Sequence, residues 1–303
     1  MIGGSEAAFS SLRRLRRQAV DVLRAAGIEN PAREADWLLT HALSVSPHAL
    51  VLDGDRRSPR PHAERAWNYI LRRAAREPLQ HLLGTQEFRG LDMTVTPDVL
   101  IPRPETEILV EETLLAVAGL PRPVVADVGT GSGCIAVSVA RECPKATVCA
   151  VDISAKALTI ARSNARRHGV FAACRFVQAD LLDAISPSAG GVFDVIVSNP
   201  PYIPDRDLDG LQPEVSRYEP RLALAAGSDG LAYHRRLLRE APPFLKPGGR
   251  LILELGFGQA EAVLQMARVA ETFAAVECRK DAAGIARVLI ARQGRLQGIR
   301  RPA

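Results

Sequence analysis

Apolar residues in the first part of the chain recur every three or four positions and show no strand-like alternation over 11–76. The first such run predicts a helix that ends at Gly27, with Leu12, Leu15, Ala19, Val22 and Leu23 on its apolar face. Asn30 is expected to cap a second helix that has Pro31 at its first position, and a third helix follows Pro59. The pattern predicts a small helical bundle whose apolar residues form its core.

The pattern changes after residue 79. Two short alternating runs around Arg89-Gly90 predict a β-hairpin. The prolines at 102 and 104 then predict a rigid loop that leads into a helix over 105–120.

From Val124 onwards, strand-like and helix-like segments alternate, which is typical of a parallel sheet covered by helices. Seven strands are predicted, at 124–128, 147–152, 174–178, 193–198, 250–255, 272–277 and 286–292. The last two follow each other across a short connection, so an antiparallel edge is expected. The fold class is α/β, and we expect four segments: a helical domain over 1–76, a hairpin linker over 77–104, the sheet domain over 105–293 and a basic tail over 294–303.

Composition limits the class of protein. The 303 residues are 47% hydrophobic and 24% charged, as in an ordinary globular protein, and no apolar run approaches the roughly 18 residues of a membrane span. Arginines over 13–17 interrupt any signal-peptide core, and the acidic Glu6 and Asp21 argue against a transit peptide, so we expect a cytoplasmic protein. Five scattered cysteines without a CxxC pair predict reduced, buried thiols, and no metal site is expected.

Charge is unevenly distributed along the chain. Residues 1–80 carry 13 Arg against nine acidic residues, the segment 291–303 carries four Arg and no acid, and the remainder has a net charge of −3. The basic ends suggest an anionic macromolecular partner, while the alternative is a solvated helix surface.

The most informative motif is Asn199-Pro200-Pro201-Tyr202, which ends the apolar strand predicted at 193–198. In an open α/β sheet, ligands bind at the carboxyl ends of the strands. The Asn199 amide oxygen and the Pro200 carbonyl offer two acceptors to a planar NH2 group, and Tyr202 offers a flat wall. The motif therefore predicts a site for an amide or an exocyclic amine; the alternative is a rigid turn.

A second motif is the glycine-rich turn Gly129-Thr130-Gly131-Ser132-Gly133, between a strand and a helix. Glycines let backbone N–H groups approach a ligand at the start of a helix. The spacing is GxGxG and no Lys-Ser/Thr follows, which excludes a P-loop. Taken alone, the segment could be only a tight turn.

Acidic residues end the next two predicted strands. Asp152 can accept hydrogen bonds from both hydroxyls of a ribose, or it can cap the helix expected at 154–168. Asp180 can accept from an adenine amine while Leu181 packs on the ring, or it can be a loop carboxylate without a ligand. Together with the glycines, these residues predict an adenosine cofactor without a pyrophosphate.

In this order, Asp127–Gly133, Asp152, Asp180 and Asn199–Tyr202 resemble the class I S-adenosylmethionine-dependent methyltransferases, with a Rossmann-like sheet. Further segments resemble the peptide chain release factor glutamine methyltransferases: GTQEFRGL at 84–91, VLIPRPETE at 99–107, EPRLAL at 219–224 and DGL at 229–231. The resemblance covers about 84–290, and the helical domain fits in size. It departs at Leu181, where the family often has an aromatic residue.

The resemblance implies S-adenosyl-L-methionine as cofactor and transfer of its methyl group to the N5 amide nitrogen of the glutamine in the Gly-Gly-Gln loop of class I release factors. It implies a catalytic role for Asn199, Pro200 and Tyr202, and cofactor contacts from Gly129–Gly133, Asp152, Asp180, Leu181 and Asn199. Substrate contacts would come from Asn199 to Tyr202, no general base is required, and a monomer is expected. Phe88, Arg103 and Glu107 are further candidates near the methionine end of the cofactor, although Arg103 fits an interdomain ion pair equally well; Glu254 and Arg287 are expected to orient structure.

Three alternatives remain. A ribosomal protein L3 glutamine methyltransferase shares Asn199–Tyr202 but usually continues differently after Ile101-Pro102-Arg103. An adenine-N6 DNA methyltransferase could hold a flipped adenine in the same motif, but the small region 1–80 and the acidic sheet domain argue against it, so no sequence-specific nucleic acid binding is expected. A non-enzymatic adaptor would leave the motif idle.

Overall fold

The computed structural model describes residues 11–270 and 272–294, so most of the predicted tail, from residue 295, lies outside the described residues. The chain divides into two compact units: Met1–Thr85 with Gln212–Tyr218, and Gln86–Leu211 with Glu219–Ala303. The first unit thus includes a short segment from the second half of the sequence.

The first unit is helical. Its helices are α1 (Leu12–Ala25), α2 (Pro31–Leu43), α3 (Pro47–Leu52), α4 (Arg60–Ala74), α5 (Leu79–Leu83) and the short α9 (Pro213–Ser216). The apolar faces of α1, α2 and α4 form one core with residues such as Leu15, Leu23, Leu39 and Ile70. Buried Arg73 pairs with Glu34 and Glu214, so α4 is tied to α2 and to the 212–218 segment.

The second unit is built on a seven-stranded sheet with the order β5-β4-β3-β6-β7-β9-β8. Its strands are β3 (Val124–Val128), β4 (Thr147–Asp152), β5 (Cys174–Gln178), β6 (Phe193–Ser198), β7 (Leu245–Glu254), β8 (Phe273–Lys280) and β9 (Ala286–Gln293). The first five strands pair in parallel, while β9 pairs antiparallel with both β7 and β8. The predicted fold class and the antiparallel edge are confirmed.

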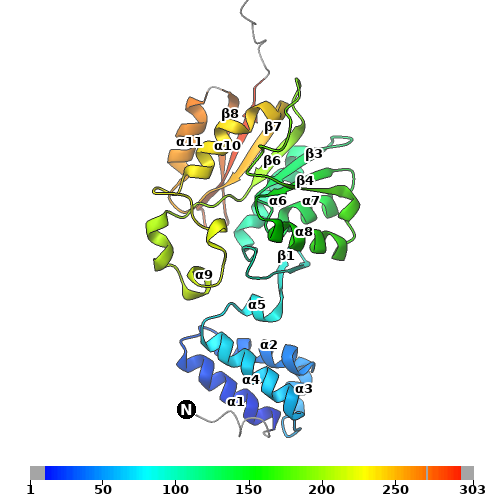
Figure 1. Cartoon of the computed structure of the whole chain (residues 1–303), viewed down its shortest axis with the longest axis vertical. Helices are drawn as coiled ribbons and strands as arrows, with labels where there is room; N and C mark the ends of the chain where they lie inside the picture. The colour runs from blue at the N-terminus through cyan, green and yellow to red at the C-terminus, as the bar shows by residue number, and fades with distance from the viewer. Residues whose placement is uncertain (1–10, 271, 295–303) are drawn as a thin grey trace, which may run out of the picture. The chain divides into compact units, whose positions relative to one another are not determined.

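Alternating side chains along the strands serve two separate cores. In β6, Val195 and Val197 face the core that contains α6 (Glu107–Val117) and α7 (Cys134–Glu142), while Ile196 faces the core that contains α10 (Ala232–Glu240) and α11 (Ala260–Val269). The helix α8 (Ala155–Arg167) lies with α6 and α7, and α10 and α11 cover the opposite face (Figure 1). Burial on both faces is why the central strands read as continuous apolar runs.

The predicted hairpin is present as β1 (Thr85–Phe88) and β2 (Leu91–Thr94). Arg89 and Gly90 both have positive φ, 50° and 72°, as a two-residue hairpin turn requires. The Arg89 N–H donates to Glu107 Oε1 at 3.2 Å, which ties the turn to the start of α6. The described part of this unit also contains short 3₁₀ segments: η2 (Pro104–Thr106), η3 (Phe171–Ala173), η4 (Asp205–Gly210), η5 (Arg221–Ala223) and η6 (Pro242–Phe244).

Several expectations were wrong in detail. Asn30 stands at the N-cap position of α2 but makes no side-chain capping bond. The strand predicted at 250–255 begins earlier, because residues 245–249 also belong to β7, where pairing with β6 skips from Leu245 to Arg250. The short α3 and α5 were not predicted, because helices of five or six residues leave no readable period. All five cysteines are free thiols, but only Cys134 and Cys174 are buried.

Among residues 11–270 and 272–294, no helix combines the length and apolar character that crossing a bilayer requires. The same part of the chain holds no group of three or more His, Cys, Asp or Glu side chains placed to bind a metal ion.

Candidate active site

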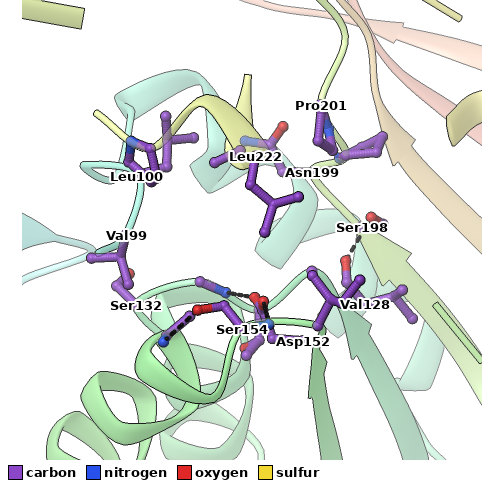
Figure 2. Close-up of a pocket in the computed structure, with 18 of the residues that line it drawn as sticks. Val99, Leu100, Val128, Ser132, Asp152, Ser154, Ser198, Asn199, Pro201 and Leu222 are labelled. Carbon is purple, nitrogen blue, oxygen red and sulfur yellow. Dashed lines mark hydrogen bonds between the residues drawn. The ribbon is translucent and has the colours of Figure 1, made fainter. Parts of the chain in front are cut away.

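A cavity opens at the carboxyl edge of β3, β4, β5 and β6, within the second unit. Its lining residues lie in the segments 98–106, 128–135, 152–157, 179–181, 198–201 and 220–223, together with Tyr233. Asn199 projects from the opposite side of the cavity to Asp152 and Ser154 (Figure 2). The two halves of the predicted site, the glycine loop with its acid and the Asn-Pro-Pro motif, therefore meet in one space.

The glycine loop follows β3 and is held down on β4. The N–H groups of Gly129 and Thr130 both donate to the Val151 carbonyl, at 2.8 and 2.9 Å. Gly129, Gly131 and Gly133 have φ of 74°, 54° and 81°, a region that L residues with a side chain rarely adopt. A Cβ on Gly129 or Gly131 would point into open space, whereas one on Gly133 would meet Ala161 of α8 at 3.0 Å. Two glycines therefore keep room for a ligand, and the third allows helix packing.

Asp127, in β3, holds this loop in place through hydrogen bonds to Thr130 and Ala136. Its Oδ2 accepts from the Thr130 hydroxyl at 2.6 Å and from the Ala136 N–H at 3.0 Å, and the carboxyl group is fully buried. Burial raises the pKa of Asp127 to about 7, against the lowering effect of these two hydrogen bonds. The group fixes the conformation of the loop and does not line the cavity.

Asp152 lines the cavity at the end of β4. Its Oδ2 accepts from the Gly131 N–H at 2.9 Å and its Oδ1 accepts from the Ser154 N–H at 2.8 Å. Burial raises its pKa, although these backbone donors oppose the rise. The capping alternative is wrong, because α8 is capped by the Ser154 side chain, which accepts from the Ala157 N–H. Each carboxylate oxygen keeps a lone pair for a further donor.

Asp180 and Leu181 line the cavity after β5. Both oxygens of Asp180 already accept from Arg236 Nη1 of α10, at 2.8 and 3.0 Å, so this carboxylate is held by a cation that the sequence analysis did not identify. Leu181 is buried and has a φ of 55°, a strained value for a branched side chain. The apolar Ile153, 46% exposed, lies on the same lining. The adenine role of Asp180 and Leu181 stays a prediction.

Asn199 is partly buried and is held by the side chain of Thr106, which is itself held by Glu254. Its Nδ2 donates to Thr106 Oγ1 at 3.1 Å, and the Thr106 hydroxyl donates to Glu254 Oε2 at 2.7 Å. Asn199 Oδ1 accepts no hydrogen bond from any residue that the structure describes. Glu254, at the end of β7, is 3% exposed, and this burial raises its pKa to about 7.

The prolines and the tyrosine of the motif have different positions. Pro200 and Pro201 line the cavity beside Asn199, but Tyr202 does not. The Tyr202 carbonyl accepts from Gln259 Nε2 at 2.9 Å, and burial raises the pKa of its phenol to about 12. A Cβ on Gly256 would approach the Tyr202 ring at 2.9 Å, so the ring packs against that loop. Packing of Tyr202 over a substrate amide stays a prediction.

The secondary candidates are spread over different environments. Arg103 lines the cavity and pairs with Glu219, whose other oxygen accepts from the Ile101 N–H at 3.3 Å. Both partners belong to the second unit, so the interdomain alternative for Arg103 is wrong. Phe88 is buried in the sheet core and Glu107 binds the hairpin turn, and neither lines the cavity.

Sequence reasoning missed Thr106 and assigned Glu254 only a structural role. Thr106 lies within the PETE segment that was used for the resemblance, but nothing in the sequence brings residues 106, 199 and 254 together. One cavity therefore combines the backbone N–H groups of the glycine loop, the Asp152 carboxylate as an acceptor for hydroxyl groups, and the oriented amide oxygen of Asn199. Such a site can hold a nucleoside-type ligand against a planar amine or amide.

Comparisons with known proteins agree with this geometry. The PrmC N-terminal domain family matches residues 14–84, and the methyltransferase small domain family matches residues 105–211. The release factor glutamine methyltransferase of Geobacter sulfurreducens is 48% identical over 240 residues, which are 79% of this chain and 82% of that protein. The one from Moorella thermoacetica is 44% identical over 281 residues, 93% of this chain and 98% of that protein.

A solved structure supports the fold alone. The hMettl16 catalytic domain matches 81% of this chain and 85% of its own, with a TM-score of 0.56 and 17% identity. Because the sequence relatives are far more similar and extend over both units, they identify more than the fold: this chain is an enzyme that belongs to the release factor glutamine methyltransferase family.

Proposed function

We propose that this protein transfers a methyl group from S-adenosyl-L-methionine to the N5 amide nitrogen of the glutamine in the Gly-Gly-Gln loop of class I release factors. One observation carries the proposal: the unpaired Oδ1 of Asn199 belongs to a cavity that also contains the Gly129–Gly133 loop and Asp152. The names of the relatives, release factor glutamine methyltransferase, select the substrate.

The cavity fits the cofactor by the chemistry of its walls. The space at the Cβ positions of Gly129 and Gly131 leaves the loop backbone accessible, and the Asp152 oxygens can accept from two ribose hydroxyls. Asp180 and Leu181 would hold the adenine. When bound, S-adenosyl-L-methionine supplies a sulfonium methyl group to the amide beside Asn199.

The Asn-Pro-Pro motif would orient and activate the acceptor. An amide nitrogen is a weak nucleophile because its lone pair is delocalised into the carbonyl, so it must be held at attack distance. Asn199 Oδ1 and the Pro200 carbonyl would accept hydrogen bonds from the two N–H groups of this amide. They would thereby stabilise the positive charge that grows on the nitrogen during transfer. The cofactor would supply the methyl group to this nitrogen, which would then lose one proton to water, so no strong general base is needed.

Release factors are the expected partners, and the helical unit is the expected docking element. Its first 80 residues carry a net charge of +4, which suits an anionic assembly. A cytoplasmic monomer fits a protein that must receive a loop of a macromolecular substrate.

Incubation with labelled S-adenosyl-L-methionine tests the proposal. Separate reactions contain a class I release factor, ribosomal protein L3 and duplex DNA, and peptide mapping locates the label. We expect label on the Gly-Gly-Gln glutamine. Label confined to L3 or to DNA adenine would instead support one of the two alternative acceptors.

The variant Asn199→Ala tests the motif. We expect turnover to be abolished while cofactor affinity changes little, because Asn199 acts mainly on the acceptor. Asn30→Ala is the matched control, since Asn30 lies in the other unit and its side chain makes no capping bond. A large loss of cofactor binding in a folded Asn199→Ala protein would show that the assigned role is wrong.

A further inference from the structure

Three side chains from separate elements form a hydrogen-bonded series that ends at the cavity. Glu254 closes β7, Thr106 ends η2 and Asn199 follows β6. The Thr106 hydroxyl is the link, since it lies 2.7 Å from Glu254 Oε2 and 3.1 Å from Asn199 Nδ2. Glu254 and Thr106 are 3% and 2% exposed, so water has little access to the series.

The direction of these hydrogen bonds depends on one proton. An ionised carboxylate only accepts, so Thr106 must donate its hydroxyl proton to Glu254. The Thr106 oxygen is then left as an acceptor for Asn199, which turns Nδ2 towards it and leaves Oδ1 for the acceptor nitrogen. A protonated Glu254 can donate to Thr106, whose hydroxyl proton then seeks an acceptor and favours the amide of Asn199 rotated by about 180°.

Resting on the function proposed above, we propose that Glu254 and Thr106 are positioning residues: the ionised carboxylate of Glu254 acts through the Thr106 hydroxyl to hold Asn199 with Oδ1 towards the acceptor nitrogen, and protonation of Glu254 releases or reverses that orientation. No bond between heavy atoms changes in this switch. One proton moves between Glu254 and solvent, and the amide of Asn199 rotates.

Several polar groups face Glu254 from the elements packed around it: Arg103, Glu105, Cys134, Tyr202, His234 and Arg287. Burial raises the pKa of Cys134 and of Tyr202 to about 12. Burial also lowers the pKa of His234, whose Nε2 is hydrogen-bonded to the backbone carbonyl of Glu254 at 2.8 Å. The pKa of Glu254 is about 7, and near that pH Cys134, Tyr202 and His234 are all neutral.

Steady-state methylation of a release factor between pH 6 and 8.5 tests the inference, with both substrates saturating. We expect wild-type kcat to rise with an apparent pKa near 7 as Glu254 ionises. Glu254→Gln should lose this acid limb, because an amide does not ionise in this range and its hydrogen bond with Thr106 is therefore the same at every pH. Asp127 also has a pKa near 7 but is unchanged in both proteins, so it cannot cause a difference between them.

Thr106→Val removes the link and keeps the shape of the side chain. We expect kcat at pH 8 to fall roughly 10- to 100-fold, the size of one lost hydrogen bond in a buried site, with cofactor affinity within about twofold of wild type. Thr106→Ser should restore activity. The matched control is Thr113→Val in α6, where the hydroxyl is buried and has no hydrogen-bond partner within residues 11–270 and 272–294, and its kcat should not change.

A measurement without acceptor protein separates this inference from the proposed function. In protein labelled with ¹⁵N-asparagine, the Asn199 side-chain resonance, assigned by its absence in Asn199→Ala, should titrate near pH 7 in wild type and not in Glu254→Gln. Equal kcat for Thr106→Val and Thr113→Val, or an unchanged titration in Glu254→Gln, refutes the inference. A wild-type protein that titrates but methylates no release factor refutes the proposed function alone.

Discussion

Replacing Gly131 by alanine tests whether the glycine loop is a cradle or only a tight turn. Gly131 has a φ of 54°, and an added Cβ would find no atom within 4 Å. Gly119, in the turn after α6, has a φ of 80° and is equally open. The two glycines therefore share their backbone requirement and differ in that only Gly131 lines the cavity.

The magnitudes follow from this comparison. A left-handed conformation costs an alanine about 1–2 kcal/mol, so both variants should lose a similar free energy of unfolding. For a unit of this size that loss lowers Tm by roughly 2–8 °C. In Gly131→Ala the new methyl group also occupies ligand space beside the N–H that binds Asp152, and we expect the Kd for S-adenosyl-L-methionine to rise at least about tenfold. Gly119→Ala should keep its affinity.

Thermal unfolding of each variant gives its loss of stability. Isothermal titration calorimetry of the folded protein with the cofactor gives its Kd. The expected pattern is two equal losses of stability and a single loss of affinity. If Gly131→Ala binds as tightly as Gly119→Ala, the loop is only a turn and the cofactor lies elsewhere.

Three further changes have definite expected outcomes. Asp152→Asn should raise the cofactor Kd roughly 10- to 100-fold in titration calorimetry. The change removes a charged hydrogen-bond acceptor, and it places the NH2 group of the new side chain against the N–H of either Gly131 or Ser154. Burial raises the pKa of Glu254 from 4.5 to about 7. The contribution of this carboxyl group to the free energy of unfolding is therefore complete below pH 4.5 and is lost as the pH rises through 7. Thermal unfolding should therefore show wild type losing stability relative to Glu254→Gln between pH 5 and 8; parallel curves would contradict this. Arg73→Ala leaves the Glu34 carboxylate without its cation, while Glu214 keeps its pair with Arg76, and urea unfolding should show a loss of about 3 kcal/mol in the helical unit.

The sequence predicted much of this protein because its strongest signals are local. The central strands β3, β4 and β6 are short apolar runs, and all seven strands overlap their predicted positions. The glycines of the loop adopt the positive φ values that glycine permits. Where local signals were weak the prediction failed, as for the five-residue α5 and for the bulged start of β7.

The site was only partly readable for a physical reason. The positions of Asp152 and Asn199 at strand ends follow from the chain, and parallel strands bring their carboxyl ends to one edge. Contacts between residues more than 50 positions apart depend on how the elements pack, and no sequence period encodes them. Arg236 on Asp180, Glu219 on Arg103 and Thr106 on Asn199 are of this kind.

By itself, the sequence determined an α/β protein with a glycine loop, an acid at the next strand end and an Asn-Pro-Pro-Tyr motif, because backbone preferences and periodic burial act over a few residues. Tertiary structure alone decided that Tyr202 stays off the cavity lining and that the amide of Asn199 donates to Thr106, whose hydroxyl in turn donates to Glu254. The orientation of a side chain is fixed by the neighbours that folding brings to it, and those neighbours come from distant parts of the chain.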